Sequence, residues 1–325
     1  MNKKKGQIIW IFYMVILVFL FLASSTNLLI KEKKNEIFPI SIIIEDSDDG
    51  DYVNFRKGME LAAAELNADV SFITLYDRNN LEQQRALINR EERDGAKALI
   101  VSPVNEEQII AAIEGNAINV PVVFLNSKLE ASAAACVTSP DYKAMGRKLA
   151  RKVDELYEKK IPVCMVGEEN RTATSRQLEE GIRSILENSG REILLYERSE
   201  DENVRGLLGR IFQKKWQSMI FIALDQESLL GLSSVFEDSI RLQPYAVGLY
   251  GRGSSLGVLN ALDRGDIDGL CVTDDFSIGY QSVQYAVEAA QKGRCKVKIK
   301  PQESYYIERQ DLRKQEFEKM LYPIE

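Results

Sequence analysis

Two short hydrophobic strands flank a helix-length stretch, and this pattern occurs twice in the sequence. The first copy runs from Ala98 to Pro103 and ends at 120–126, and the second runs from 218–225 to 245–250. Each apolar run ends abruptly at small, polar or turn-forming residues. Such runs are typical of strands buried on both faces of a parallel sheet, with the helix between them as crossover. Because ligands of open α/β sheets bind beyond the carboxyl ends of the strands, two facing sheets would form a cleft.

Strand and helix alternate through the rest of the chain from residue 37 onwards. This order predicts an α/β fold with two doubly wound parallel-sheet lobes that are alike in plan. The further strands are expected at 39–44, 70–75, 161–166 and 192–196, and helices at 52–66, 81–94, 142–159, 175–190 and 205–216.

Composition narrows the class of function. A chain of 325 residues is long enough for two domains, and 28% charged with 45% hydrophobic residues is typical of a globular protein. A net charge of −7 and the lack of a helix-turn-helix pattern disfavour a nucleic-acid partner. Histidine is absent, which removes Ser-His-Asp and Cys-His nucleophiles and histidine-containing zinc sites. We therefore expect a protein that is not an enzyme and has no cofactor.

The four cysteines are scattered without CxxC spacing, at Cys136, Cys164, Cys271 and Cys295. The first three lie in apolar, strand-like runs, where a thiol usually behaves as a small hydrophobic group. Their spacing alone leaves the question of a disulfide open.

A hydrophobic segment at 8–23 follows three consecutive lysines at 3–5. Residues 1–30 are long enough for a transmembrane anchor, and the lysines would stay on the cytoplasmic side. The predicted location is the cell membrane, with a single pass, a short charged linker at 31–37 and an extracytoplasmic binding domain. A cleaved signal peptide is the alternative, because Ala23-Ser24-Ser25 is an acceptable cleavage site. No cysteine follows the apolar run closely, which argues against a lipoprotein anchor.

The first expected strand is followed by an acidic loop, Glu45 to Tyr52. A calcium loop of the EF-hand type would need glycine at Asp51 and glutamate at Lys57, so we reject that interpretation. Aspartates in this position also cap helices well. We expect some of them to cap the next helix, while Asp49 and Tyr52 face a ligand.

The order of these elements resembles the type I periplasmic binding proteins, in particular the ribose/galactose group of sugar-binding proteins. The resemblance covers about 38–309 and is carried by 42–58, 95–103, 120–123, 174–181 and 280–293. It implies two lobes joined by a three-segment hinge, with crossings near 137–139, 272–274 and 301–304. Lobe 1 would comprise 38–138 plus 275–300, and lobe 2 would comprise 139–274 plus 301–325.

The resemblance also implies a set of ligand-binding residues. Tyr52 matches an aromatic residue that stacks on the sugar ring, whereas Asp51 replaces a second aromatic residue. Arg176 matches the ligand-binding arginine of the family. It would lie in the first turn of a helix that starts with a capping box of Thr174 and Gln177.

Other expected contacts depart from the family pattern. Asn126 lies where the family usually has an aspartate, and Ser127 lies where it has an arginine. Asp225 matches a position that is often asparagine in the family. Tyr250 replaces a frequent aspartate, and Thr273 or Asp274 replaces a polar hinge residue. The glycine-rich stretch 248–257 lacks a phosphate-binding spacing and is interpreted as a tight turn that brings a strand end to the cleft.

These features together predict a membrane-anchored extracytoplasmic solute-binding protein, expected to be a monomer, that captures a small sugar or sugar-like ligand. Its membrane partner would be an ABC permease or a sensor histidine kinase. The departures disfavour ribose or galactose itself and leave room for an amino-bearing ligand. The alternative function is a carboxylate-based enzyme acting on a carbohydrate, for instance through Asp49 and Asp225.

Overall fold

Helix α1 (Lys3–Ser25) belongs to a unit of its own, Met1–Ile37, and the other elements form a second compact unit, Phe38–Glu325. The computed structural model describes residues 3–25, 37–115, 117–127, 135–199, 201–214, 217–293 and 299–323. A search of these residues finds no helix with the length and apolarity needed to cross a membrane. The anchor at 1–30 therefore stays a prediction, and most of the predicted linker at 31–37 lies outside the described residues.

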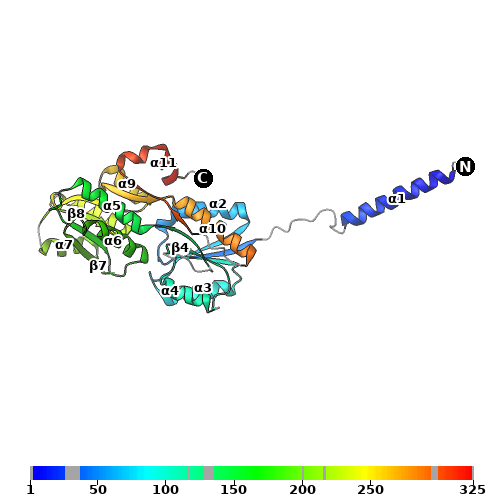
Figure 1. Cartoon of the computed structure of the whole chain (residues 1–325), viewed down its shortest axis with the longest axis horizontal. Helices are drawn as coiled ribbons and strands as arrows, with labels where there is room; N and C mark the ends of the chain where they lie inside the picture. Colours follow the sequence, from blue (N-terminus) through cyan, green and yellow to red (C-terminus); the bar gives the residue numbers. More distant parts are fainter. Residues whose placement is uncertain are drawn as a thin grey trace. The chain divides into compact units, whose positions relative to one another are not determined.

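Lobe 1 is built on a six-stranded sheet with the order β11-β5-β4-β3-β1-β2, and all neighbouring strands are parallel. Helices α2 and α10 cover one face, and α3 and α4 cover the other (Figure 1). The elements are β1 (Phe38–Ile43), η1 (Gly50–Tyr52), α2 (Val53–Leu66), β2 (Ala68–Ile73), α3 (Leu81–Arg93), β3 (Ala98–Val101), α4 (Glu106–Glu114), β4 (Val122–Leu125), β5 (Ala135–Pro140), α10 (Asp275–Lys292) and β11 (Ile299–Gln302).

Lobe 2 repeats this plan with the strand order β12-β10-β9-β8-β6-β7. Its last strand, β12, runs antiparallel to β10, which the expectation of purely parallel sheets did not include. The elements are α5 (Tyr142–Leu156), β6 (Val163–Glu168), α6 (Ala173–Leu186), β7 (Ile193–Arg198), α7 (Val204–Lys214), β8 (Met219–Ala223), α8 (Gln226–Asp238), η2 (Gln243–Tyr245), β9 (Ala246–Arg252), α9 (Leu256–Arg264), β10 (Gly269–Thr273), β12 (Ser304–Ile307), η3 (Arg309–Arg313) and α11 (Gln315–Leu321).

The central strands are buried on both faces, which explains their continuous apolar runs. In β1, Ile42 packs towards α2 and α10, whereas Ile43 packs towards α3 and α4. In β6, Met165 and Val166 divide in the same way between the two layers of lobe 2. The predicted α/β fold with two sheet-based lobes is therefore confirmed.

The chain passes between the two sheets after β5, after β10 and between β11 and β12. The first crossing predicted, 137–139, falls inside β5, so the passage itself comes after Pro140. The other two predicted crossings, 272–274 and 301–304, contain the passages observed. The exact division of residues between lobes remains a prediction.

Each lobe contains one pair of helices whose backbones touch at glycines. A Cβ atom added to Gly58 of α2 would lie 2.8 Å from the carbonyl carbon of Phe276 in α10, and closer still to its oxygen. A Cβ atom added to Gly181 of α6 would lie 3.0 Å from the carbonyl carbon of Lys143 in α5. Such close approach requires residues without a side chain on the facing surfaces. The glycines therefore fix the distance between the two helices of each pair.

Candidate functional site

A cavity of about 330 Å³ lies between the two lobes, beyond the carboxyl ends of their strands. Loops after β1, β2 and β4 of lobe 1 and after β6, β8 and β9 of lobe 2 line it. This is where open α/β sheets bind ligands, and pockets for small molecules measure roughly 300–1,000 Å³. The position predicted for the cleft and the size of the cavity therefore agree with small-molecule binding.

Carboxylates outnumber cations in the lining. Among the described residues, eight carboxylates and three guanidinium groups face the cavity: Glu45, Asp46, Asp48, Asp51, Glu168, Asp225, Glu227 and Asp275, against Arg78, Arg171 and Arg252. Despite this density, no group of three acidic or cysteine side chains in the described part of the chain is arranged to hold a metal ion.

Arg78 connects the two lobes across the cavity. Its Nε lies 2.8 Å from Asp46 Oδ1 in lobe 1, and its Nη1 lies 2.6 Å from Glu168 Oε1 at the end of β6 in lobe 2. Glu168 also accepts a bond from Arg198 at 3.0 Å. Burial nevertheless raises the pKa of Glu168, against the lowering effect of Arg78. These pairs hold the lobes in a closed arrangement.

Further hydrogen bonds join the lobes around the same cavity. The amide Nε2 of Gln226 in lobe 2 donates to Oδ1 of Asp51 in lobe 1, and the hydroxyl of Ser254 donates to Asp275. Away from the cavity, Asn54 Nδ2 in α2 donates to the carbonyl of Leu321 in α11 at 2.9 Å.

Asp51 lies at the rim of the cavity. The residue as a whole is exposed, but its carboxyl group is enclosed. This loss of solvation raises the pKa of Asp51 to about 6. The charged groups that act on it are Arg252 at the end of β9, Asp46 and Asp48 in the loop after β1, and Arg78 in the loop after β2. Asp51 therefore changes its charge close to neutral pH.

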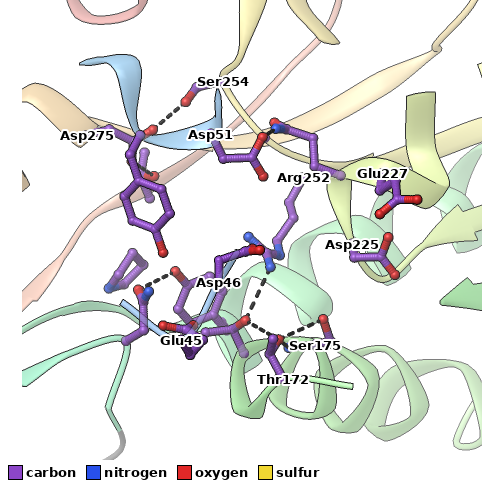
Figure 2. Close-up of a pocket in the computed structure, with 18 of the residues that line it drawn as sticks. Glu45, Asp46, Asp51, Thr172, Ser175, Asp225, Glu227, Arg252, Ser254 and Asp275 are labelled. Atoms are coloured by element: carbon purple, nitrogen blue, oxygen red, sulfur yellow. Dashed lines mark hydrogen bonds between the residues drawn. The ribbon is translucent and has the colours of Figure 1, made fainter. Parts of the chain in front are cut away.

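Glu45 is the most deeply buried acid of the lining, with 7% of its surface exposed. Its Oε2 atom has no hydrogen-bond partner among the described residues, and burial raises the pKa of the carboxyl group. Arg252 extends from the end of β9 into the same cavity (Figure 2). Its Nη2 donates to Thr174 Oγ1 at 3.2 Å, and its guanidinium lies 5.1 Å from the ring centre of Tyr142.

Four of the predicted ligand-binding residues line the cavity. Tyr52 packs against Phe72, with ring centres 5.6 Å apart, and forms part of the lobe-1 wall. Asn126 has φ of 52° and accepts the Tyr142 hydroxyl at 2.8 Å. The other two are Asp225, which caps α8, and Thr273, which donates to Asp275 at 2.6 Å.

Five predicted residues lie outside the lining. Asp49 pairs with Arg56, and Ser127 donates to Glu106 at 2.6 Å. Tyr250 lies in the lobe-2 core with 1% of its surface exposed, and its hydroxyl is 2.9 Å from that of Tyr157. The remaining two are Asp274, which caps α10 through the backbone of Ser277, and Arg176, which is exposed and donates to the carbonyl of Arg171.

The helix start near Arg176 differs from the prediction. Thr172 caps α6 by accepting from the backbone of Ser175 at 3.3 Å, so the predicted capping box of Thr174 and Gln177 is wrong. The helix starts two residues earlier than expected, and Arg171, Thr174 and Ser175 line the cavity in place of Arg176.

Sequence reasoning missed several residues of the lining, including Glu45, Arg78, Arg252 and Asp275. Signals for them existed, because Glu45 opens the acidic loop and Asp275 follows Asp274. Arg252 lies in the glycine-rich stretch, where Gly253 has φ of 138° and borders the cavity. The strand end does reach the cleft, because 252–254 line the cavity, but only 253–255 form the connection to α9, and 248–252 belong to β9 itself.

Two α/β lobes that enclose one polar cavity define a ligand-binding protein of the two-lobe class. The chain belongs to the periplasmic binding protein family, because the model described as "Periplasmic binding protein domain" matches residues 40–294. Its fold is that of the type I members, which confirms the resemblance found in the sequence. No curated protein sequence matches the chain significantly.

Solved structures with the same fold are distant in sequence. A glucose-galactose binding protein from Geobacillus stearothermophilus is 20% identical, with a TM-score of 0.73 over 86% of this chain and 99% of that one. A carbohydrate transporter solute-binding protein from Agrobacterium radiobacter, in complex with D-arabinose, is 14% identical (TM-score 0.75; 87% and 98% covered). An ABC transporter solute-binding protein from Bacillus halodurans C-125 with bound myo-inositol is 19% identical (TM-score 0.70; 86% and 97% covered).

Proposed function

We propose that this protein is an extracytoplasmic solute-binding protein that captures a small sugar-like ligand between its lobes without converting it chemically. The observation that carries the proposal is the cavity, which both lobes line and which interlobe contacts such as Arg78–Glu168 enclose. A ligand that touches both lobes favours the closed form, because the open form lacks half of those contacts. The relatives solved with D-arabinose and myo-inositol support a sugar or polyol as the class of ligand.

The competing enzyme hypothesis receives no support from the pair of carboxylates named for it. A glycosidase needs two carboxyl groups that flank one bond, and Asp49 is outside the cavity lining while Asp225 is inside it. Both oxygens of Asp225 also accept backbone hydrogen bonds, from Glu168 at 3.2 Å and from Ser228 at 2.7 Å. We therefore expect binding without turnover.

Binding is tested with the full-length chain in a mild detergent, using isothermal titration calorimetry. The probes are D-arabinose, D-galactose, myo-inositol and D-galactosamine, and each is recovered afterwards for mass spectrometry. We expect saturable binding of at least one probe, recovered unchanged. Failure of all of them to bind would contradict the proposal, and consumption of a probe would favour the enzyme.

We further propose that residues 1–30 anchor the binding domain in the membrane, for delivery of ligand to an ABC-type importer or for presentation to a sensor histidine kinase. The support is the run of apolar residues behind three lysines. Protease added to intact cells should digest the chain beyond residue 37, and mass spectrometry should find Trp10 in the mature protein. Protection from protease would refute the topology, and loss of Trp10 would show a cleaved signal peptide.

A further inference from the structure

The cavity lining carries an excess of negative charge even after the ion pairs within the protein are set aside. Arg78 is paired with Asp46 and Glu168, and Arg171 is paired with Glu179 and Glu197, which lie outside the lining. Arg252 makes no ion pair with any carboxylate among the described residues. Glu227 in turn pairs with Arg198 at 2.7 Å and with Arg78 at 3.6 Å. Among the described residues of the lining, Arg252 is therefore the one cation without an ion pair, and it faces the acids that have none either, which are Glu45, Asp48, Asp51, Asp225 and Asp275.

Most of these acids have partners within the protein. Asp225 accepts two backbone hydrogen bonds, Asp275 accepts from two hydroxyl groups, and Asp51 accepts from an amide. Asp48 accepts from the backbone of Gly50 at 2.9 Å. Glu45 is different, because its Oε2 is buried and has no partner in the part of the chain that the structure describes.

The carboxyl group of Glu45 interacts with Ser102 and with the charge of Arg252, but a buried oxygen that lacks a partner is costly because its lost hydration is not replaced. The raised pKa of Glu45 reflects the same loss of solvation. A neutral sugar could donate one hydroxyl hydrogen bond to Glu45 but would leave the excess negative charge uncompensated. An ammonium group would supply both a donor and the missing positive charge.

Arg252 offers the complementary chemistry at the same cavity. Its Nε is buried and has no hydrogen-bond partner among the described residues, so a donor is available to an oxygen of the ligand. Tyr52 lies within electrostatic reach of Glu45 and Asp51, which raise the pKa of its hydroxyl after the larger effect of burial. Tyr52 and these two carboxylates line the same cavity, so a cation bound there can contact the aromatic ring as well as the charges.

We propose that the ligand is a polyhydroxylated amine of hexose size, such as an amino sugar, whose ammonium group binds at Glu45 beside Tyr52 and whose oxygens accept from Arg252. This inference rests on the proposed function and specifies its ligand class. In Figure 2, Asp51, Arg252 and Asp275 surround one open space, and Glu45 is drawn below it.

The test compares hexosamines with the hexoses that differ from them only by a hydroxyl in place of the amine. Full-length protein in detergent is titrated by calorimetry with D-glucosamine and D-glucose, D-galactosamine and D-galactose, and D-mannosamine and D-mannose. Because a hydrogen bond to a charged group is stronger than a neutral one, we expect the best hexosamine to bind about 10- to 100-fold more tightly than its hexose. The Glu45→Gln variant should lose this preference, so that each hexosamine and its hexose bind with equal affinity.

The control is Glu155→Gln, which makes the same charge change at an exposed position on α5 outside the lining. It should bind all six sugars as the unchanged protein does. Thermal unfolding of Glu45→Gln is measured alongside, and its Tm should be equal or higher because an unpartnered buried charge is removed.

Each outcome decides a different point. Equal or tighter binding of the neutral sugars would overturn the amine inference and leave the proposed function in place. No binding of any sugar would overturn both. A hexosamine preference that survives in Glu45→Gln would remove Glu45 from the ammonium site.

Discussion

Replacement of Gly58 by alanine tests whether the contact between α2 and α10 holds the lobe-1 wall in place. The new Cβ atom would lie 2.8 Å from the carbonyl carbon of Phe276, whereas non-bonded carbons prefer about 3.5–4.0 Å. The helices must therefore separate by roughly 1 Å along a surface where Gly279 also meets the backbone of Phe55. Overpacking of this kind costs about 1–3 kcal/mol.

The severity of this contact places the expected cost near 3 kcal/mol, because both partners are backbone atoms and cannot rotate away. The higher helix propensity of alanine returns about 1 kcal/mol. The net loss of about 2 kcal/mol should lower Tm by roughly 4–8 °C in a unit of this size. Since α10 begins with Asp275, sugar binding should weaken as well.

The assay is thermal unfolding followed by circular dichroism, with Gly209→Ala as the matched control. Gly209 lies inside α7, and a Cβ atom there would meet nothing within 4 Å. Alanine at that position should raise stability by about 0.5–1 kcal/mol through helix propensity alone. A Tm for Gly58→Ala at or above that of the unchanged protein would refute the reasoning.

Three further predictions concern the cavity. Arg78→Ala removes the ion pair to Glu168. It should weaken sugar binding about 5- to 50-fold and increase the radius of gyration measured by X-ray scattering. An unchanged affinity and an unchanged radius would contradict the role of Arg78 in holding the lobes together. Arg252→Met should weaken binding about 10- to 100-fold in calorimetry, against less than ~2-fold for Arg176→Ala, and the reverse order would restore the sequence-based assignment. Hexosamine affinity should rise about tenfold from pH 5 to pH 7. The reason is that, with a pKa of about 6, the ionised fraction of Asp51 grows from roughly a tenth to nine tenths over this range. An affinity that does not change with pH would exclude Asp51 from binding the ammonium group.

The sequence was most informative about the positions of strand ends. Continuous apolar runs followed by polar residues placed Asn126 and Asp225 at the cleft, because the carboxyl end of a parallel strand has a fixed place in the fold, whereas Thr273 was implied by the family resemblance. The same argument located the acidic loop after β1. What the pattern could not give was the length of each strand to within two residues.

This uncertainty in strand length explains why Tyr250 was predicted to bind ligand and Arg252 was not. Strand β9 was expected to end at Tyr250 but continues to Arg252. Side chains two residues apart lie on the same face of a strand, so both point the same way. Tyr250 packs in the lobe-2 core, whereas Arg252 lies two residues further along the strand, beyond the core, and lines the cavity.

A similar shift, in the start of a helix, explains why Arg176 was predicted to bind ligand and Arg171 was not. Each residue turns a helix by about 100°, so a start at Thr172 instead of Thr174 changes which side chains face the cleft. Both threonines are good caps by residue type, and the short-range signal alone favours the wrong one. The choice is made by tertiary contacts, since Ser175 donates to the carbonyl of Leu224 at 3.1 Å and fixes the helix against β8.

The two lobes share a design that bears on how a ligand would be bound. The glycine-containing pairs α2–α10 and α5–α6 each bring two helix starts to the cavity, so each wall is held by contact between backbones. Such closely packed walls adapt little, because interiors at native density deform little. Motion between open and closed forms must then occur mainly at the three crossings between the sheets. Ligand preference would consequently be set by fixed charges such as Glu45 and Arg252, and changes at the crossings would alter affinity without altering that preference.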